Sequence, residues 1–151
     1  MRTKQKGKKP MLDDVDILAR TIYGEARSEG KEGMEAVACV IMNRYKAEKW
    51  FTGYCVKEGQ KIPSIAQTCL KKFQFSCWNK NDPNLAKIKK VDLSDAVFRQ
   101  CYEIAKAATN GTLADFTNGA TYYHTRQIKP VWALKHTPCY VVKNHLFYND
   151  I

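Results

Sequence analysis

The chain has 151 residues, of which 44% are hydrophobic, and a formal net charge of +10 at pH 7. Its length suits one folded domain with a sizeable core and argues against two ordinary domains. The positive charge favours a polyanionic partner, which could be nucleic acid, a membrane surface or an anionic cell-wall polymer. No apolar run approaches the roughly 18 residues of a membrane helix, so we expect no membrane insertion.

Residues 1–10 form a basic segment at the start of the chain. They hold five positive charges and no acid, and they lack apolar periodicity. We therefore expect a flexible tail ahead of a single domain at 11–151. The acids that follow interrupt the apolar core that a signal peptide would need. We expect a protein that is synthesised in the cytoplasm without a recognisable signal peptide.

Two amphipathic helices are predicted next. Over 13–27 apolar residues recur at spacings of three and four, and the acids Asp13 and Asp14 favour the start of the helix. The same period resumes over 33–48 after two glycines, so the two helices are expected to form a hairpin. The apolar residues of the first helix are Val15, Leu18, Ala19, Ile22 and Ala26.

The middle region at 50–93 is irregular and rich in Lys, Gly, Pro and Asn. Only 63–72 has a short helical pattern. The stretch 70–90 carries six lysines against one Asp. Such a region is typical of a functional loop.

A further helix is predicted over 94–109, with Ser94 as its N-cap and Gly111 just past its end. Its buried stripe is expected to consist of Val97, Cys101, Ile104, Ala105 and Ala108.

Three β-leaning segments follow, at 120–124, 139–142 and 145–148. The last two are separated by Lys-Asn and are expected to pair as an antiparallel hairpin. The fold is therefore predicted to be α+β and mainly helical, with a small antiparallel β-sheet near the C-terminus. In the first strand, Tyr122 and His124 should face one way and Tyr123 the other.

The cysteines and histidines show no metal motif. The six cysteines contain no CxxC pair, and Cys39 and Cys101 fall on apolar helix faces, where free thiols are expected. Cys55, Cys69 and Cys77 could form one bridge if the protein works outside a cell. The three histidines lack HExxH spacing, so a zinc site is disfavoured and we expect no metal and no cofactor.

Glu25 lies near the predicted end of the first helix, between Gly24 and Ala26. The helix dipole is negative at that end, so it favours the protonated form of a carboxyl group. A glycosidase needs such a carboxyl, with a pKa raised to about 6, to protonate the leaving oxygen. From the pattern alone, an ordinary exposed helix glutamate is the simpler interpretation.

Several blocks together resemble one family. The segment "LARTIYGEARSEGKEGMEAVACVIMNR" at 18–44 is followed by "FQFSCW", "GATYYH", "VW" and "HLFY". Their order and spacing are similar to those of the spore-cortex-lytic, SleB-type cell-wall hydrolases, over about residues 16–149. Ser28 departs from the family, which usually has glycine there, as do the many lysines and cysteines of the middle region. The resemblance implies a lysozyme-like α+β domain that acts on the cell wall.

The resemblance also implies that Glu25 is the catalytic acid of a peptidoglycan lytic transglycosylase. Such an enzyme cleaves between N-acetylmuramic acid and N-acetylglucosamine and needs one carboxyl. The C6 hydroxyl of the muramic sugar attacks, so the products are 1,6-anhydro sugars. A muramidase-type hydrolase is the alternative and would need a second carboxylate. We expect Glu29, Glu32 and Glu35 to be solvated or to be early-turn acids of the second helix.

Substrate contacts are expected from three blocks. Aromatic faces suit the apolar faces of sugar rings, while amides and hydroxyls suit their polar rims. The "FQFS" and "TYYH" blocks are predicted to face each other across a cleft that contains Glu25. Asn43 could orient Glu25, bind sugar, or make only a structural hydrogen bond. The predicted substrate-binding residues are Asn43, Gln74, Phe75, Ser76, Tyr122, Tyr123 and His124.

Two other classes of function remain open. A Cys/His amidase or peptidase of the cell wall would need a reactive cysteine beside a histidine, and no local motif indicates one. A basic nucleic-acid-binding module would suit the net charge and would bind with a steep salt dependence. For the cell-wall enzyme we expect peptidoglycan glycan strands as partner, no specific nucleic acid, a monomeric state, and a holin-type protein for export.

Overall fold

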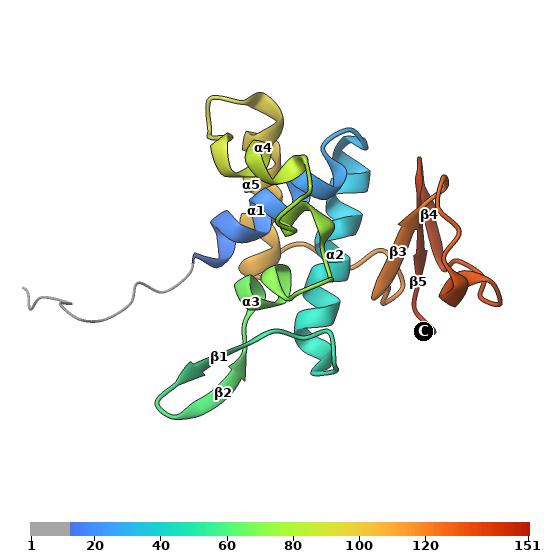
Figure 1. Ribbon diagram of the computed structural model, residues 1–151, viewed down its shortest axis with the longest axis horizontal. Helices are drawn as coiled ribbons and strands as arrows, with labels where there is room; N and C mark the ends of the chain where they lie inside the picture. The colour runs from blue at the N-terminus through green and yellow to red at the C-terminus, as the bar shows by residue number, and fades with distance from the viewer. Residues whose placement is uncertain (1–12) are drawn as a thin grey trace, which may run out of the picture.

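The computed structural model describes residues 13–151, so the predicted basic tail at 1–10 lies outside the described residues (Figure 1). The fold is α+β, as predicted, with most of the helices ahead of the C-terminal sheet. The helical elements are α1 (Asp14–Ala26), α2 (Gly30–Ala47), α3 (Ile65–Leu70), η1 (Ser76–Trp78), α4 (Asn84–Lys90), α5 (Ala96–Thr109) and η2 (Val131–Ala133). The strands are β1 (Tyr54–Lys57), β2 (Gln60–Pro63), β3 (Tyr122–Thr125), β4 (Tyr140–Val142) and β5 (His145–Tyr148).

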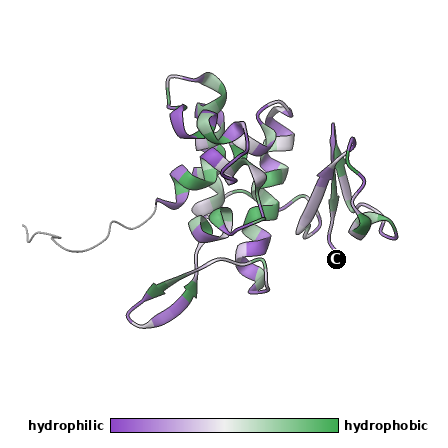
Figure 2. Cartoon of the chain, in the orientation of Figure 1, coloured by the Kyte–Doolittle hydropathy of each residue, from purple (hydrophilic) through white to green (hydrophobic). Residues whose placement is uncertain are grey.

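The helix α1 is the centre of the helical body and contacts α2, α3, α4 and α5 (Figure 1). It begins after Asp13, whose carboxylate accepts the backbone N–H groups of Val15 and Asp16 at 3.0 and 3.2 Å. Leu18, Ala19, Ile22 and Ala26 of its predicted apolar stripe are buried, and Val15 is partly buried. Figure 2 shows hydrophobic and hydrophilic residues alternating along the helices of this body, which is the pattern of amphipathic helices around one core.

The helix α5 starts one residue later than its predicted cap. Asp95, not Ser94, is the N-cap, and its carboxylate accepts the backbone N–H of Phe98 at 2.9 Å. Ser94 instead donates its hydroxyl to Asp92 at 2.5 Å. Val97 is 37% exposed, and Phe98 takes the buried place at the start of the stripe. The prediction was wrong because two adjacent residues can both cap, and their side-chain partners decide between them.

The middle region holds more structure than the sequence predicted. Besides α3, which was predicted, it contains α4 and an antiparallel hairpin of β1 and β2 that projects from the helical body (Figure 1). Glu58 and Gly59 form the turn with φ values of 50° and 79°, which suits a two-residue hairpin turn. The hairpin is largely exposed, so no strong apolar alternation marks its strands in the sequence.

The C-terminal sheet has the strand order β3-β5-β4, and both pairs are antiparallel. The predicted hairpin of β4 and β5 is confirmed, and Tyr123 of β3 lies opposite Phe147 of β5. The sheet lies beside α2, as a layer separate from the other helices (Figure 1).

Polar side chains of α2 hold the segment that leads into β3. Asn43 donates its amide to the carbonyl of Ala120 at 2.9 Å and to the carboxylate of Asp115 at 3.1 Å. Arg44 donates its Nε to the carbonyl of Thr121 at 2.6 Å. The position of β3 relative to the helices is therefore set by two adjacent residues of α2.

The other end of the sheet is held at the α1–α2 junction. Glu29 is only 7% exposed, so it is not solvated, and it is the N-cap residue of α2, directly before the first turn of that helix. Its Oε1 accepts the backbone N–H of Asn144 at 3.1 Å and lies 3.3 Å from Nδ1 of His145. Glu32, exposed on α2, accepts the hydroxyl of Tyr140. The turn between β4 and β5 packs over Glu29, which removes that carboxylate from water.

All six cysteines are free thiols, so Cys55, Cys69 and Cys77 form no bridge. Burial raises the pKa of Cys39, Cys69 and Cys101 to about 12. These thiols therefore stay protonated near neutral pH and are poor nucleophiles. Over residues 13–151, no helix is both long and apolar enough to cross a membrane.

Candidate active site

Glu25 is the penultimate residue of α1 and is half-buried where three segments meet. Its Oε1 accepts the hydroxyl of Tyr123 from β3 at 2.5 Å. Its Oε2 accepts the backbone N–H of Cys77 from η1 at 3.3 Å. Because the two oxygens are held from different segments, the plane of the carboxylate is fixed by the tertiary fold.

Gly24 allows η1 to approach this end of α1. A Cβ at position 24 would lie 2.6 Å from Cβ and 2.7 Å from Sγ of Cys77, and 3.0 Å from Ile88. Any larger residue would therefore push η1 away from the helix. The glycine before Glu25 is thus required for the Cys77 N–H to reach the carboxylate.

Tyr123 points from β3 towards the helices, as the alternation along the strand predicted. Its ring stacks on Phe147 at 5.5 Å between centroids and lies 5.1 Å from the ring of His145. Burial, and then the neighbouring Glu25 carboxylate, raise the pKa of Tyr123 well above 10. The hydroxyl therefore keeps its proton and is the donor in its bond to Glu25.

Arg44 joins the two predicted blocks to each other. It is 6% exposed, and its Nη1 donates to the side-chain carbonyl of Gln74 at 2.9 Å. Its guanidinium lies 5.1 Å from the ring of Phe75 and 5.2 Å from that of Tyr122. Burial lowers the pKa of Arg44, while Tyr123, Tyr122 and Glu25 raise it. The guanidinium stays charged at neutral pH and supplies a buried positive charge beside the carboxylate.

The sequence offered a signal for Arg44 that our prediction did not use. Arg44 follows Val37, Val40 and Ile41 at helical spacing, so a charged residue falls on the apolar stripe of α2. A buried arginine needs acceptors for its donors, which come here from segments remote in the sequence. The N–H of Cys77 had no such signal, because a backbone donor in a loop is not encoded by a side chain.

Several predicted substrate-binding residues lie elsewhere than expected. Phe75 is 2% exposed, so its ring packs mostly in the core and offers little surface for stacking on a sugar. Asn43 binds the loop before β3, as described above, and Glu25 is not among its partners. Both ring nitrogens of His124 are occupied, by the carbonyl of Thr125 and the hydroxyl of Tyr148, each at 2.8 Å.

Ser76 is exposed at the start of η1, one residue before the N–H that binds Glu25. Gln74 is half-buried, and its side-chain carbonyl is taken by Arg44. The structure thus brings Glu25, Tyr123 and Gln74 into one connected cluster around Arg44. Ser76 lies at the edge of that cluster, where it is open to solvent.

An aromatic surface that the sequence did not predict adjoins Tyr122. Its ring lies 5.1 Å from Trp132 and 6.5 Å from Trp50, and Trp50 is 62% exposed. Trp132 also packs edge-on against His124 at 5.7 Å. Aromatic faces of this kind suit the apolar faces of pyranose rings.

The described residues show no group of three His, Cys, Asp or Glu side chains that could hold a metal ion. Burial raises the pKa of the Cys77 thiol, and Glu25 raises it further. The thiol nearest the carboxylate is therefore protonated, which does not suit a nucleophilic cysteine.

Comparison with known proteins gives a family and a fold. Residues 28–148 match a family model described as Cell Wall Hydrolase, a match that begins three residues after Glu25. The spore cortex-lytic enzymes of Oceanobacillus iheyensis and Bacillus subtilis are 53% identical over 32 residues. Those residues are 21% of this chain but only 12% and 10% of the two enzymes, so the chain matches a small part of their length.

Two solved structures are similar over nearly the whole chain. One is the catalytic domain of the Bacillus cereus SleB protein, with a TM-score of 0.63 and 20% identity over 89% of this chain and 88% of that domain. The other is the catalytic domain of the germination-specific lytic transglycosylase SleB from Bacillus anthracis. It has the same TM-score and identity over 96% of this chain and 99% of that domain. At this identity the likeness shows the fold.

Proposed function

The chain belongs to the cell wall hydrolase family, and we therefore propose that it cleaves the glycan strands of bacterial peptidoglycan with Glu25 as its catalytic acid. The bond would be the one between N-acetylmuramic acid and N-acetylglucosamine. The observation that carries the proposal is the placement of Glu25. Its carboxyl group is fixed in orientation by Tyr123 and by the N–H of Cys77, where three segments of the chain meet.

The reaction is that of a lytic transglycosylase. Glu25 gives its proton to the glycosidic oxygen as the bond from that oxygen to C1 of the muramic sugar breaks. The C6 hydroxyl of the same sugar then attacks C1 and passes its proton to the Glu25 carboxylate. The product is a 1,6-anhydro sugar, no water is consumed, and Glu25 regains its starting protonation state.

A single-acid mechanism suits the surroundings of Glu25. Among residues 13–151, the Tyr123 hydroxyl and the Cys77 N–H donate to Glu25 and to no second carboxylate. Glu29, the next acid along the chain, is buried against the β4–β5 turn and accepts the N–H of Asn144. A carboxylate with this structural role is a poor base for activating water, which favours the transglycosylase over the hydrolase.

The substrate is expected to lie between Glu25 and the aromatic surface of Trp50, Tyr122 and Trp132. The buried guanidinium of Arg44 links the segments of Gln74 and Tyr122, since it donates to the side chain of Gln74 and packs on the ring of Tyr122. Rings held in this way can stack on sugars without first being ordered, which lowers the entropic cost of binding. The positioned carboxyl of Glu25 and this ordered aromatic surface support the proposal of a glycan strand as substrate.

The test uses purified peptidoglycan and mass spectrometry of the products. Anhydro ends indicate a transglycosylase, while reducing ends heavier by one water indicate a hydrolase. Glu25→Gln should fold normally and lose at least about two orders of magnitude in rate, as expected when a general acid is removed. Glu103→Gln, the same change at an exposed position of α5, is the matched control and should keep full activity. If Glu25→Gln retains more than a tenth of the activity, the assignment is wrong.

A further inference from the structure

A basic pocket lies at the segment that contains η1. It has a volume of about 610 Å³ and is lined by eleven of the residues between Leu70 and Pro83. Its charged lining consists of Lys71, Lys72 and Lys80, with Asp82 as the one acid. The site described above uses none of these four side chains.

The three lysines have no acidic partner. All three are exposed, and none forms an ion pair within residues 13–151. Asp82 uses its carboxylate to accept the N–H of Asn84 at 2.8 Å. Asp82 offsets only one of the three lysine charges, so the lining keeps a net positive charge, which favours an anionic ligand.

The same pocket carries apolar surface. Phe73 is 86% exposed and has a φ of 66°, an unfavourable conformation for an aromatic residue. Trp78 also lines the pocket, and its indole N–H donates to the hydroxyl of Thr21 at 2.9 Å. Lysines next to aromatic rings suit a ligand with both apolar groups and carboxylates.

The pocket and the catalytic carboxylate share a wall. Phe75 and Trp78 line the pocket, and Cys77 between them donates its N–H to Glu25. The pocket and Glu25 therefore adjoin the same short turn, so a group attached to a sugar bound at Glu25 would lie close to the pocket. A free wall polymer would gain nothing from this position, whereas a group attached to the reacting sugar would be placed there by the covalent bond.

We propose that this pocket binds the carboxylates of the short peptide attached to the muramic sugar of the substrate. This proposal rests on the proposed function, because it places the peptide-bearing sugar at Glu25. The lysines bind the carboxylates, while Phe73 and Trp78 cover the apolar side chains of the peptide. The enzyme consequently prefers peptide-bearing strands to strands from which the peptides have been removed.

The experiment measures kcat/KM on two glycan preparations from the same wall, freed of phosphate-containing polymers. One keeps its peptides, and the other has lost them by amidase treatment. The triple variant Lys71→Gln, Lys72→Gln, Lys80→Gln should lower the ratio of the two constants roughly tenfold, since each exposed ion pair contributes modestly. Phe73→Ala should lower the ratio further when added to it.

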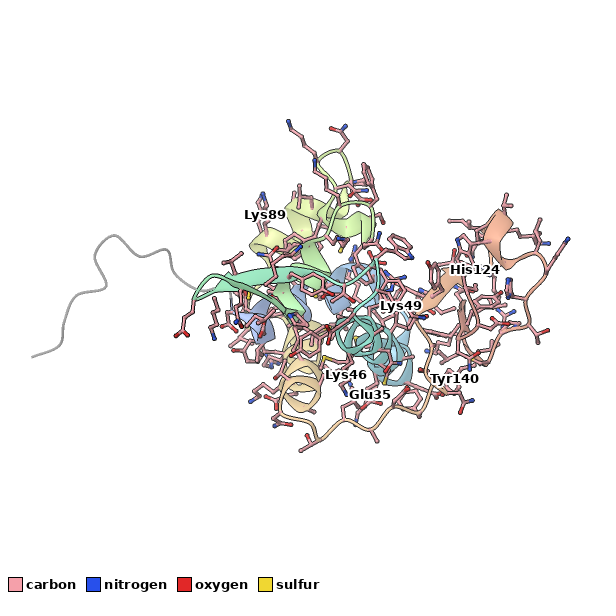
Figure 3. All side chains as sticks on the ribbon, turned by 90° about the horizontal axis from the view of Figure 1, so that it is seen from below. Glu35, Lys46, Lys49, Lys89, His124 and Tyr140 are labelled. Atoms are coloured by element: carbon pink, nitrogen blue, oxygen red, sulfur yellow. The ribbon has the colours of Figure 1, made fainter. Side chains whose placement is uncertain are left out.

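The matched control is Lys87→Gln, Lys89→Gln, Lys90→Gln. These lysines are exposed on α4 and do not line the pocket. Figure 3 shows Lys89 on the helical side of the molecule, away from His124 on the sheet. The control removes the same charge and should keep the wild-type ratio.

Three results with the variants or the wall preparation would overturn the proposal. The pocket variant could keep the wild-type ratio, the control could lose as much as the pocket variant, or the preference could appear only when phosphate-containing polymers are left on the wall. A wild-type protein that cleaves neither preparation would instead contradict the proposed function. A wild-type protein that cleaves both equally contradicts the peptide pocket alone.

Discussion

Gly24 shows at the scale of one residue how the site depends on close packing. In an exposed helix interior, replacing glycine by alanine stabilises a protein by roughly 1 kcal/mol. Here the added Cβ would lie 2.6 Å from Cβ of Cys77, and overpacking of this kind costs about 1–3 kcal/mol. We therefore expect Gly24→Ala to lower the free energy of unfolding, opposite in sign to the usual effect.

Gly24→Ala should also lower activity, because displacement of η1 removes the Cys77 N–H from Glu25. Urea denaturation and wall lysis measure the two effects. Adding Cys77→Gly removes the Cβ and Sγ atoms that clash with the new methyl group. The loss of stability in the double variant should therefore be smaller than the sum of the losses in the two single variants. A Gly24→Ala protein that is more stable than wild type and fully active would contradict this account of the site.

The elements differ in how far the sequence predicted them. The helices α1, α2 and α5 were predicted because their apolar stripes face a core that they themselves form. The hairpin of β1 and β2 was missed because it buries little, and α4 was missed because it has no side-chain cap. Glu29 was misplaced because its burial comes from the β4–β5 turn, which is more than a hundred residues away in the sequence.

In the candidate site, too, most residues with a local sequence signal were predicted, and contacts between remote segments were not. Glu25 and Tyr123 were predicted from their blocks and the family resemblance, and the fold brings them into contact. The N–H of Cys77 was missed because its role exists only once remote segments meet. Arg44 was missed although a charged residue on the apolar stripe of α2 indicated it. Phe75 was assigned to the substrate because an aromatic side chain suits a sugar and a core equally well. Sequence composition cannot distinguish these two uses.

The attachment of the sheet to the helices should be sensitive to acid. Burial lowers the pKa of His145 below the 6.5 of the free side chain. His145 therefore binds a proton more readily in the unfolded chain than in the folded protein. The free energy of unfolding consequently falls as the pH drops below 6.5 towards the lower pKa of the folded state. Because β5 pairs with β3, loosening it would also displace Tyr123 from Glu25.

The check is the thermal midpoint between pH 7.5 and pH 5. The wild type should lose stability over this interval, and His145→Gln should lose less. His136→Gln removes a different imidazole, from a half-buried position near Asp150, and tests whether the effect is specific to His145. If His145→Gln shows the full wild-type slope, the imidazole is not what makes the fold sensitive to acid.

At the scale of the whole molecule, the net charge of +10 should concentrate the enzyme on an anionic wall. Binding to isolated walls is expected to weaken with salt, since the Debye length falls from about 30 Å at 0.01 M to about 8 Å at 0.15 M. The first ten residues carry five of the positive charges. Deleting residues 2–9 should therefore weaken binding at low salt and leave cleavage of small soluble fragments unchanged, because those fragments carry little charge to attract.

Sedimentation of the protein with isolated walls measures this binding over a salt series. Wild type and truncated protein should converge at 1 M salt, where the Debye length is about 3 Å and long-range attraction is screened. The α4 variant with Lys87, Lys89 and Lys90 changed to Gln loses three charges from the folded domain and should fall between the two at low salt. If the truncated protein binds walls as tightly as wild type at 0.01 M, attraction comes from the folded surface alone. The basic segment would then have no part in reaching the substrate.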